Sequence, residues 1–194
     1  MAFGLKPVRY KDGAPYNGAA NVYYVPASDA TALYIGDPVV VAGSGDANGV
    51  PSVTRAAAGA NITGVVVGFA PKPTGTAGSD SGVNVGYRAA STEDYVLVAD
   101  GTDLLFEVIE DAVGGALAAA DIGLNADLVA AAGSTYTKQS GYMLDSSTKA
   151  TTSAQMRIVA LSPRVNNTVG GTDAVWLVSI IESAHAPASG TTGV

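Results

Sequence analysis

The amino-acid sequence predicts an all-β protein: a small β-barrel or β-sandwich with many short strands, one short helix and an extended N-terminal arm. Short runs rich in Val, Ile and Tyr recur at intervals of roughly 8–12 residues, which is typical of such folds. Turn-forming residues separate these runs, and the chain contains 24 Gly and 9 Pro. Only 14% of the residues are charged, which suits a β-rich protein or a surface covered by neighbouring proteins.

Apolar and β-branched runs mark the expected strands. They lie at residues 21–25, 33–35, 38–41, 50–54, 61–69, 83–88, 95–99, 104–109, 128–130, 142–144, 155–161 and 174–181. Asn48-Gly49 lies between two of these runs and predicts a hairpin, because Asn-Gly is favoured in tight turns. The four-residue connection at 100–103 predicts a second hairpin between the strands on either side of it. Gly64 and Gly68 predict bulges or close backbone approach within their strand.

The side-chain pattern of two strands indicates where the core lies. Leu104, Phe106 and Val108 share one face because side chains alternate along a strand, so this face is expected in the core. The opposite face carries Glu107 between two apolar residues, which indicates that another part of the structure partly covers it. Residues 174–181 are apolar on both faces, as expected of a central strand.

The remaining segments are assigned by composition. An Ala-rich stretch predicts about two turns of helix at residues 116–122, ended by a Gly. Residues 71–82 lack a large apolar side chain and predict an exposed loop, and residues 186–194 predict a flexible tail. The β-rich domain is therefore expected to span residues 19–185, and it can be divided into two β elements that meet near residues 71–90.

Residues 1–18 differ from the rest of the chain and are expected to form an extended arm. Lys6, Arg9 and Lys11 are three of the ten basic residues. Gly and Pro residues prevent a regular helix here, while large apolar side chains recur along the segment. These apolar anchors favour an arm that becomes ordered on a partner surface over a frayed terminus. Such an arm could be deleted without loss of the fold.

Composition excludes several classes of site. The chain has no Cys, so disulfides, thiol catalysis and Cys-based metal sites are excluded. It has a single His, His185, so a His-rich metal site is impossible. Its formal net charge of −7 argues against non-specific nucleic-acid binding and against binding to an anionic membrane. Because no signal-peptide core or membrane-length apolar run is visible, we expect a soluble protein made in the cytoplasm.

Three patterns resemble known sites but are better explained by turns. Residues 43–49 approach a dinucleotide-binding fingerprint, but the third Gly is one residue late and a strand follows instead of a helix. Asp46 and Asp100 begin segments that resemble part of a calcium loop without the required Glu. The adjacent Glu93 and Asp94 point to opposite faces of an extended chain, so they do not converge for acid–base catalysis. We therefore expect no enzyme activity and no catalytic, cofactor-binding or metal-binding residues.

Two runs resemble the small β-barrel core of tailed-bacteriophage capsid cement proteins, also called head decoration proteins. They are Ile35-Gly36-Asp37-Pro38-Val39-Val40-Val41 and Ile62-Thr63-Gly64-Val65-Val66-Val67-Gly68. Further runs resemble phage virion structural proteins, and with them the resemblance covers about half of the chain. These further runs lie at residues 95–100, 105–111, 120–127 and 176–181. The family pattern contains no catalytic residue.

The resemblance implies a structural virion protein of the cement or decoration type. Such a protein binds the outer surface of the expanded phage head and clamps neighbouring major capsid proteins against internal DNA pressure. The expected partners are the major capsid protein and further copies of the chain itself, as a trimer or, alternatively, a dimer. No nucleic acid, membrane, small-molecule substrate or cofactor is expected as a partner. The expected location is the outer capsid surface, after synthesis in the host cytoplasm.

Aromatic and apolar side chains near the N-terminus are the expected contacts with the capsid or between subunits, because such residues are enriched at interfaces. They are Phe3, Leu5, Arg9, Tyr10, Tyr16, Tyr23 and Tyr24. Two other classes remain open. One is a carbohydrate-binding β-sandwich, which needs exposed aromatic residues, whereas the single Trp, Trp176, lies in a core-like strand. The other is a different virion component, such as a tail or baseplate protein.

Overall fold

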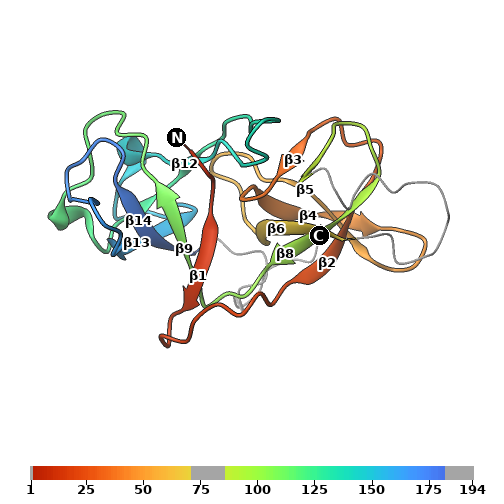
Figure 1. Ribbon diagram of the computed structural model, residues 1–194, viewed down its shortest axis with the longest axis horizontal. Helices are drawn as coiled ribbons and strands as arrows, with labels where there is room; N and C mark the ends of the chain where they lie inside the picture. Colours follow the sequence, from red (N-terminus) through yellow and green to blue (C-terminus); the bar gives the residue numbers. More distant parts are fainter. Residues whose placement is uncertain (1, 71–85, 182–194) are drawn as a thin grey trace.

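The all-β prediction is confirmed by the computed structural model, which describes residues 2–70 and 86–181. The strands form two lobes that lie side by side, a barrel and an open sheet, with β1 (Lys6–Tyr10) between them (Figure 1). The predicted loop at 71–82, the predicted tail at 186–194 and His185 lie outside the described residues. Among the described residues, no helix is long and apolar enough to cross a membrane.

The barrel contains five strands that pair in a closed ring, in the order β2-β5-β4-β6-β8. These strands are β2 (Asn21–Val25), β4 (Pro38–Gly45), β5 (Pro51–Arg55), β6 (Gly64–Ala70) and β8 (Asp94–Ala99). Mostly Val side chains fill the interior, since β-branched residues pack well on a pleated surface. The predicted hairpin at Asn48-Gly49 is confirmed, because β4 and β5 pair antiparallel around it.

Both glycines of β6 behave as predicted. The pairing of β6 with β8 shifts register between Val66 and Gly68, which marks a bulge. A Cβ on Gly64 would lie 2.5 Å from the carbonyl oxygen of Ala99, so only Gly permits this close approach of two strands.

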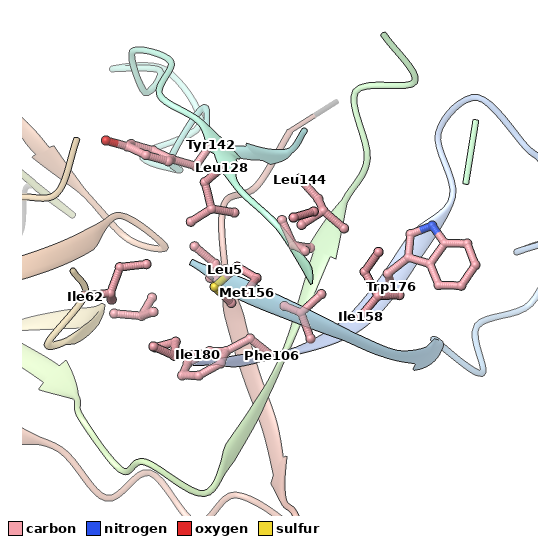
Figure 2. Close-up of a cluster of buried hydrophobic side chains, with 14 of the residues drawn as sticks. Leu5, Ile62, Phe106, Leu128, Tyr142, Leu144, Met156, Ile158, Trp176 and Ile180 are labelled. Carbon is pink, nitrogen blue, oxygen red and sulfur yellow. The ribbon is translucent and has the colours of Figure 1, made fainter. Parts of the chain in front are cut away.

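The second lobe is a five-stranded sheet in the order β1-β9-β14-β13-β10. Its strands after β1 are β9 (Leu104–Ile109), β10 (Asn125–Ala126), β13 (Met156–Leu161) and β14 (Val175–Ile180). The central position predicted for 174–181 is confirmed, because β14 pairs with β9 and β13 and is buried throughout. Leu104, Phe106 and Val108 face the core as predicted, in the cluster of which Figure 2 shows a part.

Short elements complete the fold. Two-residue strands pair as β3 (Leu33–Tyr34) with β7 (Tyr87–Arg88), and as β11 (Leu128–Val129) with β12 (Met143–Leu144). The predicted helix at 116–122 is reduced to a single 3-10 turn, η1 (Ala119–Asp121), and a second such turn is η2 (Ser146–Thr148). Positive φ angles at Gly114, Gly115 and Gly123 restrict the helix at both ends.

The predicted hairpin at residues 100–103 is wrong. β8 pairs with β2 and β6 in the barrel, whereas β9 pairs with β1 and β14 in the sheet. The four residues between them carry the chain from one lobe to the other. The two lobes therefore meet in the sequence at 100–103, after the boundary expected near residues 71–90.

The expectation that residues 1–18 extend away from the domain is corrected. β1 pairs antiparallel with β9, and Leu5 is only 1% exposed within the core of the sheet lobe. The apolar side chains that indicated an arm are therefore anchors in the chain's own fold. Most of the following residues, 11–20, are exposed and lead to the barrel along the bottom of Figure 1.

Arg88 is a buried cation that the sequence pattern did not reveal. Its guanidinium donates hydrogen bonds of 2.6–2.8 Å to the main-chain carbonyl oxygens of Pro26, Asp29, Thr31 and Thr92. Because an unpaired buried charge is very costly, this complete set of acceptors is what allows Arg88 to be only 1% exposed. Arg88 thereby holds the loops at one end of the barrel together.

The position of Leu5 generates the first prediction. The Leu5→Ala variant should lose about 3 kcal/mol of unfolding free energy, because it leaves a cavity in a packed core. Urea denaturation followed by Trp176 fluorescence measures this loss. The control is Arg9→Ala, an exposed change on the same segment that should stay within about 0.5 kcal/mol of the wild type. Equal stability of Leu5→Ala and the wild type would restore the interpretation of this segment as a detachable arm.

Candidate functional site

A groove between the two lobes has a volume of about 550 Å³. We call it the interlobe groove. It falls within the range of about 300–1,000 Å³ that is typical of ligand sites. Its walls come from the N-terminal segment, from the barrel and from two loops. The lining residues are Phe3, Leu5, Lys6, Pro7, Tyr16, Ile35, Val66, Val67, Gln139 and Arg164.

A close contact between the lobes fixes the floor of the interlobe groove. The amide of Leu5 donates a 3.0 Å hydrogen bond to the carbonyl oxygen of Gly36. Gly36 has a φ of +93°, and a Cβ there would lie 2.5 Å from the carbonyl oxygen of Phe3. A side chain at this position would therefore separate the N-terminal segment from the barrel.

Ile35 is held at the groove wall by the loop that contains Gln139. The Ile35 amide donates to the carbonyl oxygen of Lys138, and the Ser140 amide donates to the carbonyl oxygen of Ile35 at 2.9 Å. These bonds satisfy the main chain of Ile35, while its side chain stays 38% exposed. The groove thus presents an apolar side chain to solvent on a fixed backbone.

Arg164 forms the opposite rim, on the connection between β13 and β14. Its guanidinium donates a hydrogen bond to the carboxylate of Glu107 and lies 4.9 Å from the centroid of the Phe3 ring. Burial alone would raise the pKa of Glu107, but hydrogen bonds from Arg164 and Ser162 outweigh it and lower the pKa. Glu107 is therefore the charged partner of Arg164, and the predicted covering of the Glu107 face is confirmed.

The charge of the interlobe groove differs from that of the chain. Lys6 and Arg164 are its charged lining residues, and no carboxylate belongs to the described lining. The whole chain carries a formal net charge of −7. Glu107, just outside the lining, pairs with Arg164 and lies opposite Lys6 on the neighbouring strand, so the rim keeps one positive charge in excess. The groove is therefore an apolar site with a weakly positive rim on an acidic protein.

The structure brings only part of the predicted contact set together. Phe3, Leu5 and Tyr16 line the interlobe groove. Arg9 is exposed on β1, and Tyr10 is half-buried with its ring centroid 6.5 Å from that of Tyr16.

The adjacent pair Tyr23 and Tyr24 alternates as the sequence predicts. Tyr24 is half-buried on the outside of the barrel, where its ring centroid lies 5.4 Å from that of Tyr95. Tyr23 lies inside the barrel, is 5% exposed and donates a 2.8 Å hydrogen bond to Asp100. The prediction of Tyr23 as a contact residue is therefore wrong, because its ring fills the barrel interior.

Several groove residues are not recognisable as contact residues in the sequence. Ile35 and Val66 belong to expected strands and to the runs that carry the resemblance, and Gln139 and Arg164 carry no signal. Their separation along the chain explains this, since only the tertiary fold brings them to one place.

Asp46, from the calcium-like pattern, and the buried Glu110 both accept hydrogen bonds from the chain's own groups. Asp46 accepts hydrogen bonds from the amides of Asn48 and Val50 and from the hydroxyl of Tyr95, and the Tyr95 bond is the main cause that lowers the pKa of Asp46 to about 2. Glu110 accepts from the amide of Leu117 and from the indole of Trp176, which is fully buried as predicted. Within residues 2–70 and 86–181, no group of three or more potential metal ligands occurs.

Asp37 lies next to Gly36, behind the floor of the groove. One carboxylate oxygen accepts a 2.9 Å hydrogen bond from the amide of Tyr34, and the other has no hydrogen-bond partner in the described structure. Burial raises the pKa of Asp37 to about 6, against the opposing effects of the Ser140 hydroxyl, the Tyr34 amide and the Arg55 charge. Asp37 is therefore a buried carboxyl that changes charge close to the contact between the lobes.

Comparison with protein-family models, with curated proteins and with solved structures finds no match for this chain. A functional proposal therefore depends on the resemblance carried by short runs of the sequence and on the geometry of the fold and the interlobe groove.

The raised pKa of Asp37 predicts how stability changes with pH. The protonated form is favoured by folding, so its contribution is fully present below the unfolded pKa of 3.8 and is lost as the pH rises through about 6. The difference between these values corresponds to about 3 kcal/mol. The unfolding free energy of the wild type, minus that of Asp37→Asn, should fall by most of this amount between pH 4 and pH 7.5 in urea titrations. Asp173→Asn, at an exposed position, serves as the control. Parallel pH profiles of the wild type and Asp37→Asn would contradict this assignment.

Proposed function

We propose that this chain is a structural protein of a tailed-phage virion, of the capsid cement or decoration type. It binds the outer surface of the expanded head, as an oligomer, and clamps neighbouring major capsid proteins against the pressure of the packaged DNA. The proposal continues from the resemblance of residues 35–41 and 62–68 to the small β-barrel core of cement proteins.

The observation that carries the proposal is the pairing of these two runs. They are separated by twenty residues, yet Pro38 pairs with Val65 and Val39 pairs with Gly64 in neighbouring strands of one closed barrel. Hydrogen bonds of 2.8 and 2.9 Å from Gly36 to Val66 and from Val66 to Asp37 extend this contact. The runs that resemble a barrel core are therefore structural neighbours in a barrel.

The edges of the sheets limit the kinds of contact that such a protein can make with a partner. The barrel has no free edge, and the outer edge of β1 contains Pro7 and a register shift between Pro7 and Arg9. Residues 14–16 also return along β1, where the Tyr16 amide donates to the Val8 carbonyl oxygen. These features block strand addition at that edge. The expected contacts are therefore made by side-chain surfaces, repeated over many copies on the shell.

A carbohydrate-binding module receives no support from Trp176, which is enclosed in the core of the sheet lobe. A tail or baseplate component shares the requirements of a structural virion protein, and the binding partner distinguishes it from a cement protein. The experiment therefore has to score the partner directly.

The prediction is saturable binding to expanded, undecorated shells of the phage that encodes the chain. Purified protein is mixed with shells, the shells are sedimented, and the amount bound is measured against the major capsid protein. We expect a fixed ratio at saturation, because identical sites repeat over the shell. Shells before expansion serve as the control and should bind much less. An expanded shell that binds no protein would refute the cement function and would leave a tail component as the next partner to test.

A further inference from the structure

We propose that the interlobe groove binds an extended, acidic segment of the major capsid protein, with an apolar side chain in the groove and a carboxylate at its positive rim. The identity of the partner rests on the proposed function. The chemistry of the segment is inferred from the groove itself.

The groove offers an apolar surface with no side chain of the described structure filling it. Phe3, Ile35 and Val67, all partly exposed, contribute walls from both lobes around a volume of about 550 Å³. Ile35 remains 38% exposed although it is a large aliphatic residue next to a buried core. Covering such a side chain with an apolar group of a partner is favourable, because apolar surface leaves water.

The rim specifies the charge of the occupant. Lys6 is exposed, and the side chain of Arg164 is 39% exposed while Glu107 and Phe3 hold its guanidinium in place. A guanidinium has five N–H donors, so the contact with Glu107 leaves donors for a further carboxylate. With Glu107 paired to Arg164, Lys6 leaves one positive charge in excess at the rim and no carboxylate belongs to the groove lining, so an acidic segment is favoured over a basic one.

The fixed geometry of the walls favours binding. Hydrogen bonds from Leu5 to Gly36 and from Ser140 to Ile35 hold the two sides of the groove without a ligand. A site that exists before binding does not have to be ordered by the ligand, which lowers the entropic cost of association.

Photo-cross-linking identifies the occupant. The chain contains no Cys, so Ile35→Cys creates a single position for a benzophenone label in the groove. Tyr136→Cys gives a matched label outside the groove lining, at a residue that is 92% exposed. On expanded shells, the label at position 35 should cross-link to an Asp- or Glu-containing segment of the major capsid protein. A cross-link from position 35 to a second copy of this chain, or to a basic segment, would overturn the proposal.

Charge reversal tests the rim. Lys6→Glu should weaken binding to the shells by about five- to tenfold, because an attraction at the rim becomes a repulsion. Lys11→Glu makes the same change of charge just after the same strand, outside the groove lining, and it should bind much more like the wild type. Equal losses for both variants would show a general charge effect and would also overturn the groove proposal.

A titration with a short peptide of alternating Leu and Asp separates this proposal from the cement function. Methyl NMR signals of Ile35 and Val67 should shift with this peptide and should not shift with its Leu-Asn counterpart. Shifts in a protein that does not bind shells would refute the cement function and support the groove chemistry. Shell binding at a fixed ratio without shifts, and with an unchanged Lys6→Glu variant, would support the cement function and refute the groove proposal.

Discussion

The rest of the structure depends on a hydrophobic core that the two lobes share. Ile62 and Val65 from the barrel side pack in the same cluster as Leu5, Met156 and the other residues of the sheet lobe, as Figure 2 shows for Ile62. Hydrogen bonds also connect the two lobes at this junction. The hydroxyl of Tyr142 donates to the carbonyl oxygen of Ala56, and the side-chain amide of Gln155 donates to the carbonyl oxygens of Ala57 and Ala60. Because separating the lobes would expose the apolar surface of this core to water, the junction holds the two walls of the interlobe groove in a fixed relative position.

The prediction from sequence succeeds where local interactions decide the structure and fails where distant segments meet. The strand β2 and the hairpin at Asn48-Gly49 follow from side-chain alternation and turn chemistry, which a short window of residues contains. The turn at 100–103 has the same local features, but both of its strands find better partners elsewhere in the chain. The N-terminal segment shows the same limit: its apolar anchors are visible in the sequence, but their attachment to β9 is not.

The groove illustrates why only part of a binding surface could be predicted. Phe3 and Tyr16 are recognisable because large apolar residues are unusual in a terminal segment rich in Gly and Pro. Arg164 lies more than 150 residues after Phe3 in the sequence. It becomes part of the groove only because the connection that leads into β14 places it near Glu107 and Phe3. The acidic residues were more visible in the sequence, yet Asp46 and Glu110 use their oxygens for the chain's own amides, where they stabilise turns and loops.

The position of the groove links the binding of a ligand to the stability of the contact between the two lobes. A segment that contacts Phe3 on one side and Val67 on the other touches both lobes at once. Any ligand that binds only when the lobes are joined stabilises the joined form in proportion to its affinity and concentration. Under the proposed function, the repeated subunits of a shell would present such segments at a high local concentration and would maintain this stabilisation. Capsid binding and resistance to separation of the lobes would then depend on the same contact. The capsid segment in the interlobe groove would attach this protein to the shell and would also stabilise the junction between its two lobes.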